Sequence, residues 1–163
     1  MKKIVLRRAD KKDCRDLWAW RNHPEVRKWH FNAKIIEYKI HMKWFEGKIG
    51  SDNACIYIAE NQKKEKTGQI RMEVGADRIA YVTIDLNPEF FGRGLGSKII
   101  KMGTEVFMGE NPRIRGMAAE ICSKNIASHK AFEKAGYAFS HNDLKKDRRI
   151  VVYRFKKTGQ GNF

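Results

Sequence analysis

Cysteine, long apolar segments and acidic residues are all scarce in this chain of 163 residues. There are three cysteines, at Cys14, Cys55 and Cys122, and an odd number at wide spacing argues against a disulfide framework or a zinc site. No apolar run approaches the length that spans a bilayer, and residues 1–7 contain no apolar core of the signal-peptide kind. We therefore expect a cytoplasmic protein with reduced thiols, no membrane partner and no metal.

The shortage of acidic residues leaves a strongly basic protein. Asp and Glu number 19 against 34 Lys and Arg, so the formal net charge is +15. Such an excess favours anionic partners, among them coenzyme phosphates, nucleotide-linked substrates and nucleic acid. Nucleic acid is not expected, because the sequence has neither a Cys/His finger nor an aromatic RNP pattern. One local basic run, residues 145–149, falls at a predicted hairpin turn, and we interpret it as a solvated tip.

The remaining composition, 42% hydrophobic and 33% charged, is typical of a soluble globular protein. The length predicts one domain, residues 1–157, with a flexible tail at 158–163. A strand at 3–8 is followed by a helix that Asp10 or Asp13 can cap and that ends at Asn22-His23-Pro24, because the residue before proline avoids helical geometry. A second helix is predicted over 36–47, with an apolar stripe at Ile36, Ile40, Trp44 and Phe45.

After these two helices the sequence predicts three strands, a helix, a strand, a helix and two final strands. A strand is predicted at 55–60, and a hairpin at 69–74 and 78–86 turns around Gly75-Ala76-Asp77. A long helix ends near Gly109, a strand follows at 115–121, and Gly136 caps the next helix. Two strands at 137–140 and 150–155 close the sheet.

A glycine-rich loop joins the strand at 78–86 to the long helix, in which Leu95, Ile99, Met102 and Val106 recur at helical spacing. Gly92, Gly94 and Gly96 leave backbone N–H groups uncovered at a helix N-terminus, which predicts a phosphate-binding site. Arg93 and Lys98 add cationic donors. The loop is not a Walker loop, since no Gly-Lys-Ser/Thr ends it, and a dinucleotide fingerprint read from Gly94 would need glycine at Ile99.

Two stretches resemble the GCN5-related N-acetyltransferases, the GNAT superfamily. Phe91-Gly92-Arg93-Gly94-Leu95-Gly96, after Leu86-Asn87-Pro88, resembles their pyrophosphate loop, Gln/Arg-x-x-Gly-x-Gly/Ala after a strand that ends in hydrophobic-x-Pro. Phe91 departs from the pattern at a position that contributes mainly its backbone. Residues 123–137, with Asn125 opening a helix that ends in Glu133-Lys134-Ala135-Gly136-Tyr137, resemble the second GNAT signature.

The resemblance implies an α/β fold with a mixed, mostly antiparallel sheet of six to seven strands and helices on both faces. The fourth and fifth strands splay apart, and the pantetheine arm of acetyl-CoA, the implied cofactor, enters the gap. The implied cofactor-binding residues lie on the strand end, the glycine loop and the second signature helix. They are Leu86, Phe91, Gly92, Arg93, Gly94, Leu95, Gly96, Ser97, Asn125 and Phe132.

Direct acetyl transfer to an amine needs a base and an oxyanion donor. In the family the backbone N–H near Leu86 is the usual oxyanion donor, and many members place a Glu base on the strand before the loop. This chain has Asp85, Thr83 and Tyr81 there instead, and Glu73 on the neighbouring strand is a candidate that acts through water. The residues leave these alternatives open.

The leaving thiolate must be protonated or solvated. The family often has Tyr where this chain has Phe132, which has no proton to donate. Ser128 lies one helical turn earlier on the same face. The ribosomal-protein N-acetyltransferases carry a comparable Asn-x-x-Ser arrangement, so the resemblance suggests a role for Ser128 beside the thiol.

Trp20-Arg21-Asn22-His23-Pro24 is similar to the end of the first helix in ribosomal-protein N-acetyltransferases and in the aminosugar N-acetyltransferases of pseudaminic-acid pathways. The resemblance makes Arg21, Asn22, Trp29 and His30 acceptor-site candidates. A nucleotide-linked amino sugar is the leading acceptor and a protein or peptide α-amine is its rival. A non-catalytic GNAT-like binding module is the alternative from another class, and the protein is expected to be a monomer or homodimer.

Overall fold

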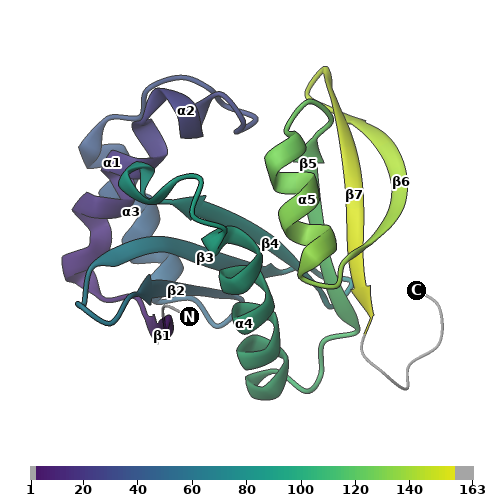
Figure 1. Ribbon diagram of the computed structural model, residues 1–163, viewed down its shortest axis with the longest axis horizontal. Coiled ribbons are helices and arrows are strands. Elements are labelled where there is room, and N and C mark those ends of the chain that lie inside the picture. Colours follow the sequence, from purple (N-terminus) through teal and green to yellow (C-terminus); the bar gives the residue numbers. More distant parts are fainter. Residues whose placement is uncertain (1–2, 157–163) are drawn as a thin grey trace.

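The computed structural model describes residues 3–156, in which a seven-stranded sheet carries helices on both faces (Figure 1). The predicted tail at 158–163 lies outside the described residues. The strands, in the spatial order β1-β2-β3-β4-β5-β7-β6, are β1 Val5–Arg8, β2 Ala54–Glu60, β3 Lys66–Val74, β4 Ile79–Leu86, β5 Gly116–Cys122, β6 Ala138–Lys145 and β7 Arg148–Lys156. The helices are α1 Cys14–Asn22, α2 Pro24–Arg27, α3 Tyr38–Ile49, α4 Leu95–Glu110 and α5 Ile126–Lys134, with 3-10 turns at Lys11–Asp13 and Pro88–Phe90.

The sheet opens between β4 and β5. These two strands run parallel and pair only where residues 79–81 of β4 face residues 116–118 of β5. All other neighbouring strands in the sheet are antiparallel. Beyond the short paired region the two strands separate, and Figure 1 shows β5 and β7 turned away from β3 and β4. The predicted fold class, with its splay between the fourth and fifth strands, is therefore confirmed.

Each face of the sheet has its own core, because successive side chains of a strand point to opposite faces. On β2, Ile56 and Ile58 pack with Leu17 of α1 and Phe45 of α3. The alternate β2 residues join the larger core under α4 and α5. The sheet thus separates a face covered by α1 and α3 from a face covered by α4 and α5.

Two predictions for the first helices need correction. The first helix ends at Asn22 as expected, but Pro24 then begins the short helix α2, which was not predicted. The second helix is Tyr38–Ile49 rather than 36–47, because the Asn22 side chain bonds both the N–H and the carbonyl of Ile36 at 2.8 Å and keeps it out of the helix. Ile40, predicted on the apolar stripe, is 61% exposed.

The closing hairpin is longer than predicted. Strands were expected at 137–140 and 150–155, whereas β6 extends to Lys145 and β7 begins at Arg148. The turn between them therefore consists of Lys146 and Asp147. Both turn residues have positive φ, 48° and 59°, the conformation of a type I′ hairpin turn. β6 is an edge strand with mostly exposed residues, so its polar sequence carries no alternating pattern that would predict a strand.

The helix α4 approaches the sheet closely at Gly103. A Cβ built at this glycine would lie 2.9 Å from two side-chain carbons of Ile70 and 3.1 Å from Cε of Met72. Ile99, one turn earlier, is fully buried. The missing side chain therefore lets the middle of α4 pack directly on β3.

We expect Gly103→Ala to lower the free energy of unfolding by about 1–3 kcal/mol, since the added methyl overpacks β3 despite its better helix propensity. Gly109→Ala in the same helix is the matched control, because a Cβ there meets nothing within 4 Å. Denaturant unfolding of both variants measures the difference. Equal effects at the two positions would contradict this account of the packing.

Candidate functional site

The glycine loop adopts a geometry that suits an anion. Gly92 and Gly94 have positive φ, 72° and 69°, which other residues rarely adopt, and a Cβ at either would meet nothing within 4 Å. Gly94 is the N-cap of α4 and provides no side-chain cap, so its first turn keeps N–H donors for a ligand. These residues therefore fit the pyrophosphate of a coenzyme.

The loop opens into a cleft of about 1000 Å³ that enters the splay. Its walls come from the open part of β4, the loop, the start of α4, the end of β5, α5 and the segment around α2. All of the predicted cofactor-binding residues line it except Arg93. The guanidinium of Arg93 instead donates to the Glu89 carbonyl at 2.8 Å and lies over the Phe90 ring.

The open edge of β4 presents a backbone donor to this cleft. The N–H of Asn87 donates to the Thr67 carbonyl on the β3 side at 3.0 Å. In an extended chain successive N–H groups point to opposite edges, so the N–H of Leu86 points toward β5. Leu86 lies in the part of β4 that has no pairing with β5. This donor is therefore available at the splay.

The start and middle of α5 form the opposite wall. Asn125 caps the helix, its side-chain oxygen accepting from the Ser128 N–H at 3.2 Å. Ser128 lines the cleft, and Phe132 is buried with its ring edge-on to Tyr137. The Tyr137 hydroxyl lies 2.8 Å from that of Thr104, and burial raises the pKa of Tyr137. The phenol is thus held in the core, whereas Ser128 brings a hydroxyl to the cleft.

Two predicted residues from different elements meet at the floor of the cleft. His30 Nε2 lies 2.7 Å from Asp85 Oδ1, and Gln69 donates from Nε2 to Asp85 Oδ2 at 3.1 Å. Burial opposes the charge on Asp85, but His30, Arg71 and Gln69 outweigh it and hold the pKa of Asp85 below its ordinary value. Asp85 is therefore an ionised carboxylate that orients the His30 ring.

The other predicted base candidates lie elsewhere. Tyr81 is 39% exposed in the paired part of β4, and its hydroxyl is 3.4 Å from Asp77. Glu73 forms ion pairs with Lys48 of α3 and with Arg71. Neither residue lines the cleft, and Thr83 is the one further candidate on β4 that does.

The basic run at 145–149 is more than a solvated tip, and this prediction is corrected. Arg148 donates to the His30 carbonyl at 2.5 Å and to the Lys28 carbonyl at 2.9 Å. Lys145 pairs with Glu120 and places its ammonium 5.1 Å from the centre of the Phe31 ring. The β6–β7 hairpin therefore clamps the segment that carries His30.

The acceptor-site candidates have different roles in the structure. Trp29 and His30 line the cleft. Asn22 anchors Ile36, and Arg21 donates from Nη2 to the Asn32 carbonyl at 2.5 Å. Arg21 also lines a second cavity of about 270 Å³, which shares Asp85 and His30 with the cleft. Gln69 and Arg148, which hold this region together, were not predicted as site residues.

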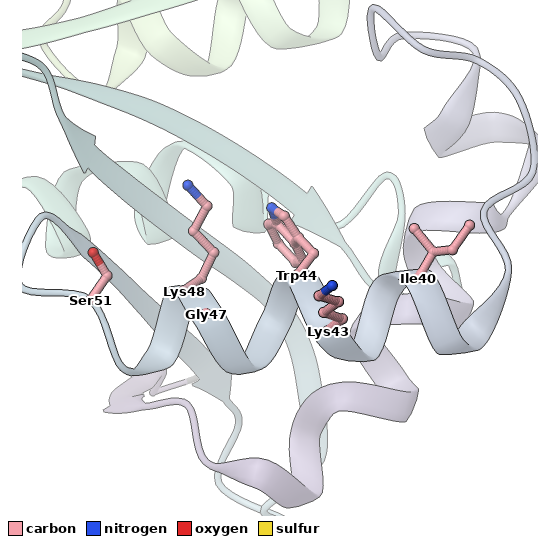
Figure 2. Close-up of a pocket in the computed structure, with 6 residues that line it drawn as sticks. All are labelled: Ile40, Lys43, Trp44, Gly47, Lys48 and Ser51. Carbon is pink, nitrogen blue, oxygen red and sulfur yellow. The ribbon is translucent and has the colours of Figure 1, made fainter.

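A third hollow, of about 530 Å³, lies along α3 (Figure 2). Figure 2 shows Trp44 and Lys48 rising from the same side of the helix. None of its lining residues reaches the cleft, although Ile40 and Trp44 also line the second cavity. The glycine loop, the splay and the His30–Asp85 pair therefore point to the cleft as the functional site.

A family model for the acetyltransferase (GNAT) domain matches residues 3–138. The chain belongs to the GNAT acetyltransferase family. The fold and the superfamily that the two signatures predicted are thus confirmed, whereas the resemblance to the aminosugar and ribosomal-protein branches stays a prediction. No curated protein matches the sequence as a relative.

Solved structures show the same fold at low sequence identity. A spermidine N-acetyltransferase from Vibrio cholerae, in complex with CoA and spermine, is 14% identical with a TM-score of 0.83, over 94% of this chain and 95% of that one. An aminoglycoside acetyltransferase in complex with coenzyme A and kanamycin is 18% identical with a TM-score of 0.81, over 95% of each chain. In this GNAT protein no helix of the described residues is long and apolar enough to cross a membrane.

We expect Arg148→Ala to release the segment around His30, because two charge-assisted hydrogen bonds are lost. Amide hydrogen exchange over residues 28–36 should accelerate about ten-fold or more. Arg149→Ala, at the exposed neighbour on the same hairpin, is the control and should leave exchange there unchanged. Unchanged exchange in the Arg148 variant would contradict the clamp.

Proposed function

We propose that this GNAT protein is an acetyl-CoA-dependent N-acetyltransferase that acetylates a primary amine directly. The observation that carries the proposal is the continuous path from the open glycine loop, through the β4–β5 splay, to the His30–Asp85 pair. Both solved neighbours are described in complex with coenzyme A, which supports the choice of cofactor.

The residues that would hold the cofactor follow from the geometry of the cleft. The N–H groups of the loop and of the first turn of α4 suit the pyrophosphate. Lys124, which precedes α5, and Lys130 and Lys134 of α5 bring further positive charge to the same cleft. Leu86 offers its backbone donor at the open strand edge, where a carbonyl oxygen that gains charge needs one. Acetyl-CoA, when bound, supplies the acetyl thioester.

His30 is the general base that the geometry supports best. In the tautomer whose Nε2–H donates to the ionised Asp85 carboxylate, the His30 ring has its Nδ1 lone pair available to accept a proton. Nδ1 of His30 has no hydrogen-bond partner within residues 3–156, and the side chain lines the cleft. We therefore assign proton removal from the amine to His30 Nδ1 and treat Asp85, itself predicted as a base, as the residue that positions it. Ser128 remains the proposed partner of the leaving thiolate.

We expect His30→Ala to lower kcat by about 100-fold or more, on the scale of general base catalysis. The affinity for acetyl-CoA should stay near that of the parent, because His30 lies on the α2 side and not in the glycine loop. Glu73→Gln is the control, since Glu73 is a rival base outside the cleft, and its turnover should be retained. Steady-state kinetics measures kcat and calorimetric titration measures the affinity for acetyl-CoA in both variants. Parental turnover in the His30 variant would show that His30 is not the base.

A test of the cofactor site uses Gly94→Glu, which places a bulky anion in a left-handed position where phosphate is expected. Acetyl-CoA affinity should fall at least about ten-fold, because like charges repel and the N–H donors are covered. Gly109→Glu adds the same charge at the far end of α4 and should bind normally. Isothermal titration calorimetry measures the acetyl-CoA affinity of both variants. Parental affinity in the Gly94 variant would refute the assignment of the glycine loop as the cofactor site.

We propose a nucleotide-linked amino sugar as the leading acceptor. The net charge of +15, the guanidinium of Arg21 and the aromatic rings of Trp29 and Phe31 at the cleft suit phosphates and a planar base. The rival, a peptide α-amine, is supported by the open edge of β4, which can pair with an extended chain. Acetylation of N-terminal peptides but of no nucleotide-linked amino sugar would favour the rival. The cytoplasm stays the proposed compartment, supported by three unpaired cysteines.

A further inference from the structure

The second cavity, of about 270 Å³, lies on the α1 and α3 face of the sheet beside the catalytic cleft. It shares His30, Arg71 and Asp85 with the cleft, so the two spaces meet at the proposed base. Much of its wall is apolar. The apolar lining residues are Leu17, Ile36, Ile40 and Trp44.

Besides Arg71 Nε, which lies 2.7 Å from Glu73 Oε1, three polar side chains of this cavity have a buried atom without a hydrogen-bond partner among the described residues. These atoms are Arg21 Nη1, His41 Nε2 and Gln69 Oε1. His41 is 4% exposed and Gln69 is 3% exposed. Burying a polar atom without a partner destabilises the folded protein, so three such atoms in one small space favour a polar ligand that satisfies them.

The charges around the cavity do not balance. Arg21 and Arg71 line it together with the carboxylate of Asp85, which already accepts from His30 and Gln69. Glu73, outside the lining, pairs with Arg71, so among the described residues Arg21 is the lining guanidinium without a carboxylate in an ion pair. Burial lowers the pKa of Arg21, opposed by Asp85 and reinforced by the positive charges of Arg71 and Arg27. The folded protein therefore holds a guanidinium that an added anion would stabilise.

The unpaired atoms also define the chemistry of the ligand. Arg21 Nη1 is a charged donor, and it forms its strongest hydrogen bond with an anionic acceptor. Gln69 uses its Nε2 on Asp85, so its Oε1 is left as an acceptor and requires a donor on the ligand. The ligand therefore combines an anionic group with a hydroxyl or an ammonium group.

We propose that this cavity is an acceptor subsite that binds a carboxylate or phosphate group of the substrate and so directs its amine to His30. The inference rests on the proposed N-acetyltransferase function and names the acceptor class, a primary amine that carries a compact anion. A nucleotide-linked amino sugar brings phosphate and an amino acid brings carboxylate. Polycations such as spermine and kanamycin, bound by the two structural neighbours, are the opposite class.

The first arm of the test offers acetyl-CoA with matched amines. The pairs are an amino acid and its amide, and a nucleotide-linked amino sugar and the free sugar; spermidine and kanamycin complete the panel. We expect a KM at least about ten-fold lower for the anionic member of one pair, and that pair identifies carboxylate or phosphate as the source. Preference for the polycations would overturn the anion subsite yet leave the acetyltransferase function intact. Acetylation of none would instead overturn the proposed function.

The second arm uses Arg21→Gln, with Arg27→Gln as the matched control. Arg27 donates to the Ala33 carbonyl in the same loop that Arg21 contacts, but it does not line the cavity. Arg21→Gln should raise the KM of the anionic acceptor about ten-fold or more and leave its neutral counterpart and acetyl-CoA affinity unchanged. Arg27→Gln should match the parent. Equal KM changes for both members of a pair would contradict the subsite.

The third arm is independent of catalysis. Tryptophan fluorescence, to which Trp44 in the cavity wall contributes, is titrated with acetate and with inorganic phosphate. We expect one of the two anions to bind saturably to the parent and to the Arg27→Gln variant. Its binding to the Arg21→Gln variant should be weaker. Arg21→Lys keeps the charge and should retain part of the binding, which separates loss of charge from loss of fold. No saturable binding of either anion to the parent would overturn the subsite.

Discussion

The separation of β4 from β5 is the constraint on which the rest of the site depends. Parallel strands need continuous hydrogen bonding to stay together, and here it stops after residues 79–81 and 116–118. The backbone groups beyond that point still require partners. The opening therefore creates both an entrance for a ligand and a row of donors and acceptors inside it. The glycine loop follows directly from the open end of β4, so anion binding and the splay belong to one continuous segment.

The His30 segment links the two halves of the divided sheet. His30 contacts Asp85 on β4 through its ring, while its carbonyl accepts from Arg148 on β7, on the other side of the splay. A short loop is thus fixed from both sides by charged partners, which limits the freedom of the ring before substrate arrives. Such preorganisation is what a general base needs, because a misplaced ring loses the aligned geometry on which proton transfer depends.

The two faces of the sheet provide different parts of the site. The α4 and α5 face provides the glycine loop, the apolar core and Ser128, whereas the α1 and α3 face provides the cavity with Arg21 and His41. Asp85 lies at the boundary and lines both spaces. A substrate amine and a thioester can therefore approach from opposite faces and meet at the open edge of β4. The two structural neighbours are described with spermine and with kanamycin, which are polycations, whereas the arginines that line this cavity favour an anion.

The sequence alone determined what depends on neighbours in the chain. The glycines at 92 and 94 mark a left-handed loop before a helix, and with the second signature they predicted the family and the splay. The cofactor-binding residues predicted from them line the cleft, with the exception of Arg93. The tertiary structure decided what depends on distant residues. His30 and Asp85 lie 55 positions apart, and His30 and Arg148 lie 118 apart, so no local pattern relates them. The edge strand β6 has no alternation because it has little core to face, and the helix α3 starts late because a side chain from α1 holds Ile36. Local periodicity predicts the strand or helix to which a residue belongs. Which charged residues pair across the fold depends on how the elements pack in three dimensions.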